Sequence, residues 1–300
     1  MEKLNNYTKI LAFPIQSDNS IVSYSTLMCD FNDSLSINNE PILIDCENIQ
    51  FIKPFGLNLL AAMMFYHLQN GNKVFIKIPL ASDVRKYLTD TGFFQEFSIE
   101  QNQVTSAPRS TSVALKRLEQ VDGTYLDNIA QWINYNGDIP LRVARDLVSI
   151  SLLEAINNVF DHSHSLIGCY ISAQAYHKVK QLTLSILDFG IGLFNSLKPF
   201  YPDIRDDCDA ISKAVLEGVS SKRKIEKRVR GVGLTNISGF LLNRGSMEIV
   251  SYKGYWYQRH DGVIETKTLV CPLKGTCVNL YIDKQSIIDI VEIEEEIWGE

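Results

Sequence analysis

The chain has 300 residues and a formal net charge of −6 at neutral pH. This length accommodates two domains that each bury a core, and the acidic balance argues against nucleic acid as the main partner. No apolar run approaches the ~20 residues of a membrane-spanning helix, and the polar start is unlike a signal peptide, so we expect a cytoplasmic protein without membrane contacts.

Six cysteines are scattered along the chain without a Cys-x-x-Cys pair. Several lie inside apolar, strand-like runs, where free cysteine behaves as a small buried hydrophobe. We therefore expect buried thiols rather than disulfides or a metal site. The cysteines are Cys29, Cys46, Cys169, Cys208, Cys271 and Cys277.

The first hundred residues alternate short strands and helices. Apolar runs of strand length cover residues 42–46 and 73–78, and helical patterns cover residues 54–68 and 83–89. An Asn-Gly-Asn sequence at residues 70–72 supplies a turn. This order predicts an α/β domain over residues 1–100.

The middle and the end of the chain have a different character. Residues 101–124 are polar with scattered breakers, which is typical of a linker or an irregular strand. Residues 284–300 form an acidic tail, for which a partner-binding helix and a frayed end are both open.

A second α/β domain is predicted over residues 125–283. A helix over residues 125–135 precedes a long helix that begins near Pro140, since the fixed φ of proline suits a first helical turn. Two strand-like runs then form a hairpin over residues 168–188. Later elements complete a sheet with helices on one face: helical patterns over residues 208–218 and 232–243, and strands over residues 245–250 and 277–282.

The long helix carries the first chemical motif. Glu154 and Asn158 are four residues apart, which puts a carboxylate and an amide on one face, with His162 one further turn along. The neighbouring Asp161 and His164 add to a local cluster, but His162 and His164 are two residues apart and diverge on a helix, so we expect a structural role there rather than a metal site.

The second motif follows about thirty residues later, at the end of an apolar strand. Asp188 ends this strand, and Gly190 and Gly192 allow the backbone to bend tightly against a flat ligand. A carboxylate and two glycines in a turn are weak evidence alone, because such turns are common. Combined with the helix motif, they predict a nucleotide pocket.

These residues resemble the sequence boxes of the GHKL ATPases, a superfamily that includes histidine kinases, type II topoisomerase ATPase domains, mismatch-repair ATPases, chaperones and anti-sigma-factor kinases. Residues 230–234 resemble the second glycine box, and Gly275 with Thr276 resembles the last box. The four boxes occur in family order over roughly residues 125–283. The resemblance implies a GHKL (Bergerat) α/β two-layer sandwich that binds ATP and Mg²⁺.

The resemblance also implies roles for individual residues. Asp188 would accept a hydrogen bond from the adenine amine, and Thr276 would reach the same edge of the base through water. Asn158 would hold Mg²⁺ through its amide oxygen, and Glu154 would act as general base or, alternatively, only orient a neighbour. His162 corresponds to a histidine of the anti-sigma kinases.

Asp161 corresponds to an acidic residue of the chaperone branch. Between the two glycine boxes lies a segment of some forty residues that resembles the ATP lid, and its basic run directly precedes the second glycine box. We favour phosphate binding over a merely solvated face for this run. The expected phosphate-side residues are Ser221, Lys222, Arg230, Gly231, Val232, Gly233 and Leu234.

The first hundred residues resemble the STAS domain of anti-sigma-factor antagonists, through the sequence of residues 51–57 at a strand-to-helix turn. Phosphorylatable STAS domains carry an Asp-Ser pair where this chain has Lys53 and Pro54. Proline has no hydroxyl, so phosphorylation at that position is excluded. A docking or regulatory module for a protein partner and a purely structural half are both open.

The sequence therefore predicts a STAS-like domain followed by a GHKL domain that binds Mg·ATP and acts as an ATPase-type conformational switch on a partner. The alternatives are a protein serine/threonine kinase of the anti-sigma type that acts on a separate STAS protein, and a scaffold that binds ATP without turnover. A histidine kinase fits less well, because no helical hairpin with a phospho-accepting histidine precedes the ATPase domain. Family members often work as dimers, so a homodimer is a further expectation.

Overall fold

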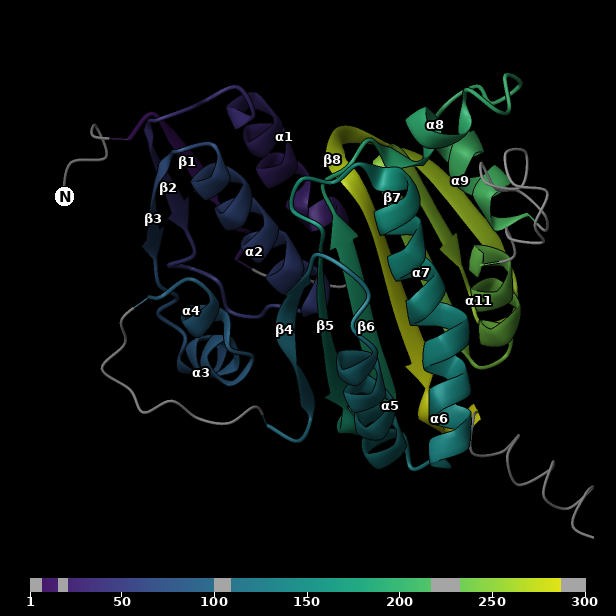
Figure 1. The fold of residues 1–300 in the computed structure, drawn as a ribbon. Coiled ribbons are helices and arrows are strands. Elements are labelled where there is room, and N and C mark those ends of the chain that lie inside the picture. Colours follow the sequence, from purple (N-terminus) through teal and green to yellow (C-terminus); the bar gives the residue numbers. More distant parts are fainter. Residues whose placement is uncertain (1–6, 16–20, 100–108, 217–232, 287–300) are drawn as a thin grey trace, which may run out of the picture.

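The computed structural model describes residues 7–15, 21–99, 109–216 and 233–286. It is a mixed α/β protein with two sheets, one parallel and one antiparallel (Figure 1). The coarse fold class predicted from the sequence is therefore confirmed. In the described residues, no helix is long and apolar enough to cross a membrane.

The N-terminal half holds a parallel three-stranded sheet in the order β1-β2-β3. The two predicted strands and the two predicted helices are all present, whereas β1 and the first helix were not predicted. The elements are β1 (Lys9–Ala12), η2 (Ile21–Tyr24), α1 (Ser25–Ser34), β2 (Pro41–Asp45), α2 (Pro54–Gln69), β3 (Lys73–Lys77), α3 (Ser82–Asp90) and α4 (Phe93–Glu96).

The C-terminal half holds an antiparallel five-stranded sheet in the order β4-β5-β6-β8-β7. The predicted hairpin is confirmed as β5 and β6. Strand β4 falls inside the range for which a linker and an irregular strand were both open, and it pairs with β5 with an irregular register between Val113 and Lys116. The strands are β4 (Ser112–Leu118), β5 (Cys169–Tyr176), β6 (Gln181–Asp188), β7 (Gly245–Gln258) and β8 (Ile264–Asp283).

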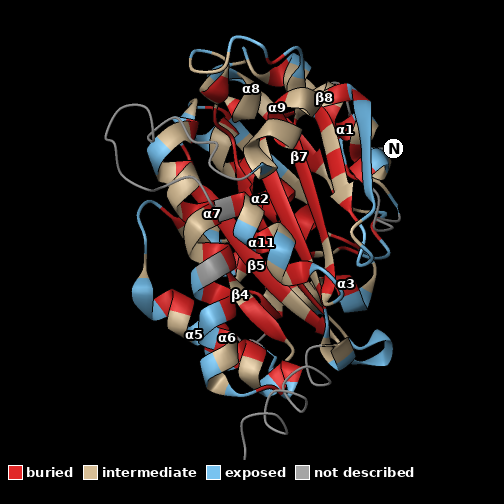
Figure 2. Cartoon of the chain, turned by 90° about the vertical axis from the view of Figure 1, so that its right-hand side faces the viewer, coloured by how far each residue is buried: buried red, intermediate tan, exposed pale blue. Residues whose placement is uncertain are grey.

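Helices cover the front face of this sheet, as the pattern predicted (Figure 1). That face is apolar, and Figure 2 shows that the strands beneath the helices are largely buried. The helices of this half are α5 (Gly123–Gly137), α6 (Leu141–Leu147), η3 (Val148–Leu152), α7 (Leu153–Asn158), η4 (Val159–Ser163), η5 (His177–Val179), α8 (Gly192–Leu197), α9 (Asp207–Val215) and α11 (Gly233–Leu241).

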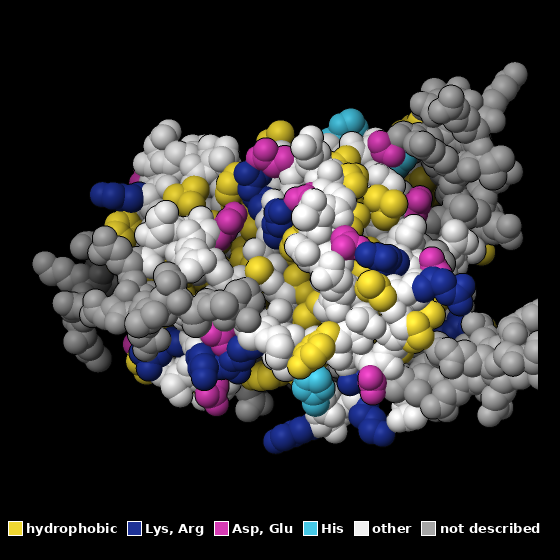
Figure 3. Space-filling model, turned by 60° about the horizontal axis from the view of Figure 1, so that its bottom comes forward, with side chains coloured by type: hydrophobic (Ala, Val, Ile, Leu, Met, Phe, Trp, Pro, Cys, Tyr) yellow, Lys and Arg dark blue, Asp and Glu magenta, His cyan; other side chains and the backbone are white. Residues whose placement is uncertain are grey.

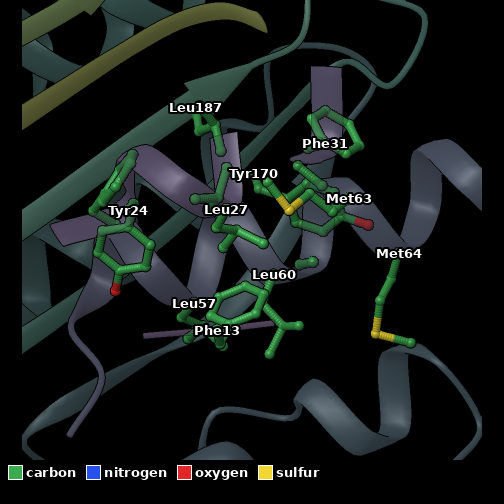
Figure 4. Packing of buried hydrophobic residues seen from close by; sticks show 14 of the residues in the cluster. Phe13, Tyr24, Leu27, Phe31, Leu57, Leu60, Met63, Met64, Tyr170 and Leu187 are labelled. Carbon is green, nitrogen blue, oxygen red and sulfur yellow. The ribbon is translucent and has the colours of Figure 1, made fainter. Parts of the chain in front are cut away.

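The rear face of the sheet is covered by the N-terminal half, because α1 and α2 lie between the two sheets (Figure 1). Every residue from Pro54 to Met64 is buried, as expected for a helix enclosed on all sides. Figure 4 shows Tyr170 and Leu187 of the antiparallel sheet beside Leu27 and Met63 of these helices. The two halves thus share one hydrophobic core.

A disulfide joins the two halves. Cys29 on α1 and Cys271 on β8 are bonded, with their Cα atoms 5.2 Å apart, a separation typical of disulfides. The expectation that the cysteines are all free thiols was therefore wrong for this pair. It failed because a contact between residues 242 positions apart leaves no local pattern in the sequence. The other four cysteines are free.

Charged side chains are mixed over the face drawn in Figure 3, where Lys and Arg lie among Asp and Glu. Surface ion pairs join opposite charges in the described residues, such as the partly exposed pair of Lys77 with Asp45 and the exposed pair of Arg145 with Asp127. Exposed pairs of this kind contribute little to stability. On this face of the described residues, no broad patch of a single sign offers a surface for a polyanion.

Candidate nucleotide site

The helix that carries the first motif is continuous from residue 141 to residue 163, but it is not α-helical throughout. Glu154 and Asn158 lie on the α-helical part, α7, and both side chains are partly exposed. The π-helical segments η3 and η4 lie on either side of α7. Such π segments occur frequently at functional sites.

His162 lies on the π-helical segment η4, about one turn beyond Asn158. In this segment backbone hydrogen bonds span five residues rather than four. His162 is partly exposed and Asp161 is exposed. The helix ends at His164, whose φ of 51° is left-handed.

Asp188 is a deeply buried ionisable residue among the predicted site residues. It is the last residue of β6, and only 3% of its surface is exposed. The backbone N–H of Gly190 donates a hydrogen bond of 2.7 Å to its Oδ1. Burial raises the pKa of Asp188 from 3.8 to about 7, although backbone hydrogen bonds from Gly190 and Thr276 and the charge of Lys274 oppose the rise.

Two hydroxyl groups lie next to this carboxylate. Thr276 on β8 is directly opposite Asp188 in the strand pairing, and Ser251 on β7 is opposite Thr276 in turn. The two hydroxyl oxygens are 3.1 Å apart. Ser251 also accepts a hydrogen bond of 2.8 Å from the backbone N–H of Leu193, which fixes the beginning of α8. A row of polar side chains therefore crosses three strands at one end of the sheet.

The helix and the glycine loop meet at a backbone hydrogen bond. The N–H of Ile191 donates to the carbonyl oxygen of Ser163 at 2.7 Å, and the Ser163 residue ends η4. Two motifs that are separated by about thirty residues in the sequence are thus adjacent in space, as the resemblance implied.

The glycines of this loop have a different immediate role from the one predicted. A Cβ atom at Gly190 would lie 2.1 Å from the carbonyl oxygen of Ser163, and one at Gly192 would lie 2.5 Å from the ring of Tyr252. Gly192 also has a φ of 73°, a left-handed backbone conformation that residues other than glycine rarely adopt. Both glycines are therefore required by contacts within the protein itself, whatever ligand binds.

The second glycine box is only partly described. Gly233 is the first residue of α11, and the side chain of Leu234 is buried in the core beneath the helix layer, so Leu234 contributes packing rather than a polar contact through its side chain. The predicted residues Ser221, Lys222, Arg230, Gly231 and Val232 lie outside the described residues.

Two residues of the site were not predicted. Ser251 is fully buried, and Lys274 is half-buried with its pKa lowered by burial, an effect that Asp188 opposes. A single serine in a strand and a single lysine before a glycine carry no distinctive signal. Only their alignment with Asp188 across the sheet makes them part of the site.

A pocket of about 290 Å³ lies at the same end of the molecule, but it does not contain the predicted adenine-binding residues. Its lining includes Ser165, whose Oγ accepts a hydrogen bond of 3.3 Å from the backbone N–H of Phe189. The pocket is lined by Arg117, Glu119, Val159, Phe160, His164, Ser165, Leu166 and Gly168.

The described residues contain no cluster of three or more His, Cys, Asp or Glu side chains that could hold a metal by themselves. A magnesium ion bridging phosphates needs fewer protein ligands, commonly one or two, because phosphates and water supply the rest. The side chains of Asn158 and Glu154 make no hydrogen bond or ion pair to another described residue. Their oxygens therefore fit such an ion.

No protein-family model matches the chain, and a search of curated proteins finds no matching relative.

Proposed function

We propose that the chain is an Mg·ATP-binding protein of the GHKL class in which nucleotide binding and hydrolysis switch the conformation of a partner-binding surface. The observation that carries the proposal is the buried carboxylate of Asp188 at a strand end, aligned with the hydroxyl of Thr276. The backbone N–H groups of Gly190 and Thr276 already donate to this carboxylate, and its two oxygens can accept a further hydrogen bond from a ligand. The exocyclic amine of adenine is such a donor, whereas guanine presents a carbonyl there.

The phosphate side of the proposal rests on Glu154 and Asn158. Both lie on the helix whose end is hydrogen-bonded to the glycine loop through Ser163. Asn158 would hold Mg²⁺ by its side-chain oxygen. Glu154 would accept a proton from the water that attacks the γ-phosphorus, while the bond to the ADP oxygen breaks and inorganic phosphate leaves.

The N-terminal half supports a STAS-like assignment through its parallel sheet and the position of α2. The residue at the place of the phosphorylated serine, Pro54, begins α2 and is buried. Its carbonyl oxygen accepts a hydrogen bond of 3.2 Å from the hydroxyl of Ser172 on β5. We propose that the surface that other STAS domains offer to a kinase is, in this chain, bound to the chain's own antiparallel sheet.

The test uses the purified full-length protein, its Glu154→Gln variant and γ-labelled ATP with Mg²⁺. Label is counted as free phosphate and as protein-bound phosphate, and nucleotide affinity is measured in parallel by calorimetry. We expect the wild type to bind ATP at least about tenfold more tightly than GTP and to release phosphate. Glu154→Gln should retain binding and lose release by about two orders of magnitude, the typical contribution of a general base.

Each other outcome selects a different function. Label transferred to a protein of a cell extract, with no free phosphate, would make the chain a kinase of the anti-sigma type. Tight ATP binding with neither product, unchanged by Glu154→Gln, would leave a nucleotide-gated scaffold. Equal affinity for ATP and GTP would refute the assignment of Asp188.

A further inference from the structure

The two backbone segments that carry Asp188 and Thr276 are both held by the N-terminal half. One segment is the loop after β6, and the other is the part of β8 just before Thr276. They touch each other, because a Cβ atom at Gly275 would lie 2.1 Å from the carbonyl oxygen of Asp188. Any shift of one segment is therefore transmitted to the other.

The loop is held through Phe189, the residue next to Asp188, which is only 4% exposed. Its ring packs against Phe31 of α1, with ring centroids 5.1 Å apart, and against Tyr66 of α2 at 6.4 Å. Phe31 and Tyr66 also pack edge to face on each other at 5.5 Å. Aromatic pairs with these geometries stabilise contacts beyond the area that they bury.

The β8 segment is held at three points by the same two helices. The side-chain amide of Asn32 on α1 donates a hydrogen bond of 2.6 Å to the carbonyl oxygen of Pro272. The disulfide fixes Cys271 to the same helix. The ammonium group of Lys274 lies 5.8 Å from the ring centre of Tyr66, a cation–π distance.

Tyr66 is the residue that contacts both segments. It packs on Phe189 on one side and on Lys274 on the other, and its hydroxyl donates a hydrogen bond of 3.0 Å to the carbonyl oxygen of Leu35 at the end of α1. Its contacts therefore join α1, α2 and the two segments that carry Asp188 and Thr276.

From these contacts we infer that the N-terminal half is a built-in positioning element for adenine recognition, with Phe31 and Tyr66 as the positioning residues that hold Asp188 and Thr276 in register. The inference rests on the proposed nucleotide site and adds its regulation. Whatever loosens α1 and α2 from the sheet would lower the affinity for adenine nucleotides without touching a residue that binds them. The N-terminal half would thus control the site in cis.

The test compares Tyr66→Leu with Tyr66→Phe, which keeps the ring and loses only the hydroxyl. Tyr135→Leu is the matched control, because Tyr135 is 73% exposed and far less constrained. Affinities for Mg·ATP and Mg·GTP are measured by calorimetry, and hydrogen exchange is followed by mass spectrometry in peptides covering residues 186–193 and 272–278. Circular dichroism checks that each variant is folded.

We expect Tyr66→Leu to bind Mg·ATP about tenfold more weakly while its binding of GTP stays unchanged, so that base selectivity falls. Amide exchange should accelerate in both peptides. Tyr66→Phe and Tyr135→Leu should behave like the wild type. Should Tyr66→Leu fail to fold, Phe31→Leu is the second variant, and the same two readouts apply.

The inference is overturned if a folded Tyr66→Leu variant keeps both its ATP affinity and its slow exchange. The exchange readout does not depend on nucleotide. If the wild type shows no preference for ATP, the proposed function has failed. Faster exchange in Tyr66→Leu alone would then support the positioning contact, and unchanged exchange would refute it.

Discussion

The side-chain amide of Asn58 on α2 donates a hydrogen bond of 2.9 Å to the carbonyl oxygen of Ser185 on β6, and both residues are completely buried. This single bond crosses the interface between the two halves of the chain. The amide oxygen of Asn58 has no partner among the described residues. The interface therefore contains a specific polar contact within an otherwise well-packed core.

Replacing Asn58 tests how much this buried contact contributes to stability. Asn58→Asp would bring a buried carboxylate against a carbonyl oxygen, and we expect it to lower the free energy of unfolding by about 3–5 kcal/mol. Asn58→Leu removes the donor and the unpaired oxygen together and should cost only about 1 kcal/mol. Urea unfolding monitored by circular dichroism measures both. Similar losses in the two variants would show that the hydrogen bond, rather than charge burial, dominates.

The Asp188→Asn variant should be more stable than the wild type at high pH and yet lose its preference for ATP. Between about pH 4 and 7 the carboxyl of Asp188 is protonated in the folded protein and ionised in the unfolded chain. The free energy of unfolding therefore falls as pH rises through this range, by on the order of 4 kcal/mol. Asparagine avoids this cost. We expect the variant to exceed the wild type in stability at pH 8, to match it near pH 4, and to lose its preference for ATP.

The measurement is urea unfolding of the two proteins at pH 4.5 and pH 8, together with calorimetry of ATP binding at the higher pH. A variant that binds ATP with wild-type affinity would contradict the adenine assignment. A variant with the same stability difference at both pH values would contradict the raised pKa of Asp188.

His67 should give the opposite dependence on pH. It is completely buried between Ser34 and Asn72, each 3.1 Å from a ring nitrogen, and burial lowers its pKa from 6.5 to about 4. The unfolded chain takes up a proton first as pH falls, so stability is lost between pH 6.5 and about 4, by on the order of 3 kcal/mol. We expect His67→Gln to flatten this acid limb in the pH profile of the free energy of unfolding.

A steeper acid limb in His67→Gln than in the wild type would contradict this assignment. Asp188 and His67 change the free energy of unfolding in opposite directions over overlapping pH ranges, so their effects partly cancel in the pH profile of the wild type. Comparing the profiles of the two variants separates the two contributions.

The bond between Cys29 and Cys271 predicts a thiol count. All six cysteines lie in described residues, so a denatured, unreduced sample should react with a thiol reagent at four sites: Cys46, Cys169, Cys208 and Cys277. Closing so long a loop restricts the unfolded chain, and a reductant should reduce the free energy of unfolding by typically ~2–4 kcal/mol. The Cys29→Ser/Cys271→Ser double variant should not respond to the reductant. Six reactive thiols in the unreduced sample would refute the bond.

Local patterns predicted much of this fold. The hairpin of β5 and β6 and the helix α2 follow directly from apolar runs and turn residues. Strand β1 is only four residues long, and α1 is buried by a sheet that begins more than seventy residues later, so neither stands out in the sequence. The π-helical geometry of η4 depends on packing around the helix rather than on residue type, so the sequence did not predict it.

The candidate site shows the same division. Asp188 and Thr276 stand out in the sequence because Gly190 lies two residues after Asp188 and Gly275 directly precedes Thr276. Ser251 and Phe189 could not, because their importance arises from strand pairing and from a contact with the other half of the chain. Sequence motifs therefore identify candidate site residues more readily than the residues that hold them in place.

The enclosure of α2 between the two sheets also determines how tightly another protein must bind to displace it from the antiparallel sheet. Because α2 belongs to the same chain as its binding surface, its effective concentration there is that of a tethered ligand, about millimolar for a flexible connection and higher for a rigid one. A free protein that presents a similar helix to this surface must overcome that advantage. Weak, abundant helices are thereby rejected, and only a tight binder, or a signal that first releases α2, gains access to the rear of the sheet.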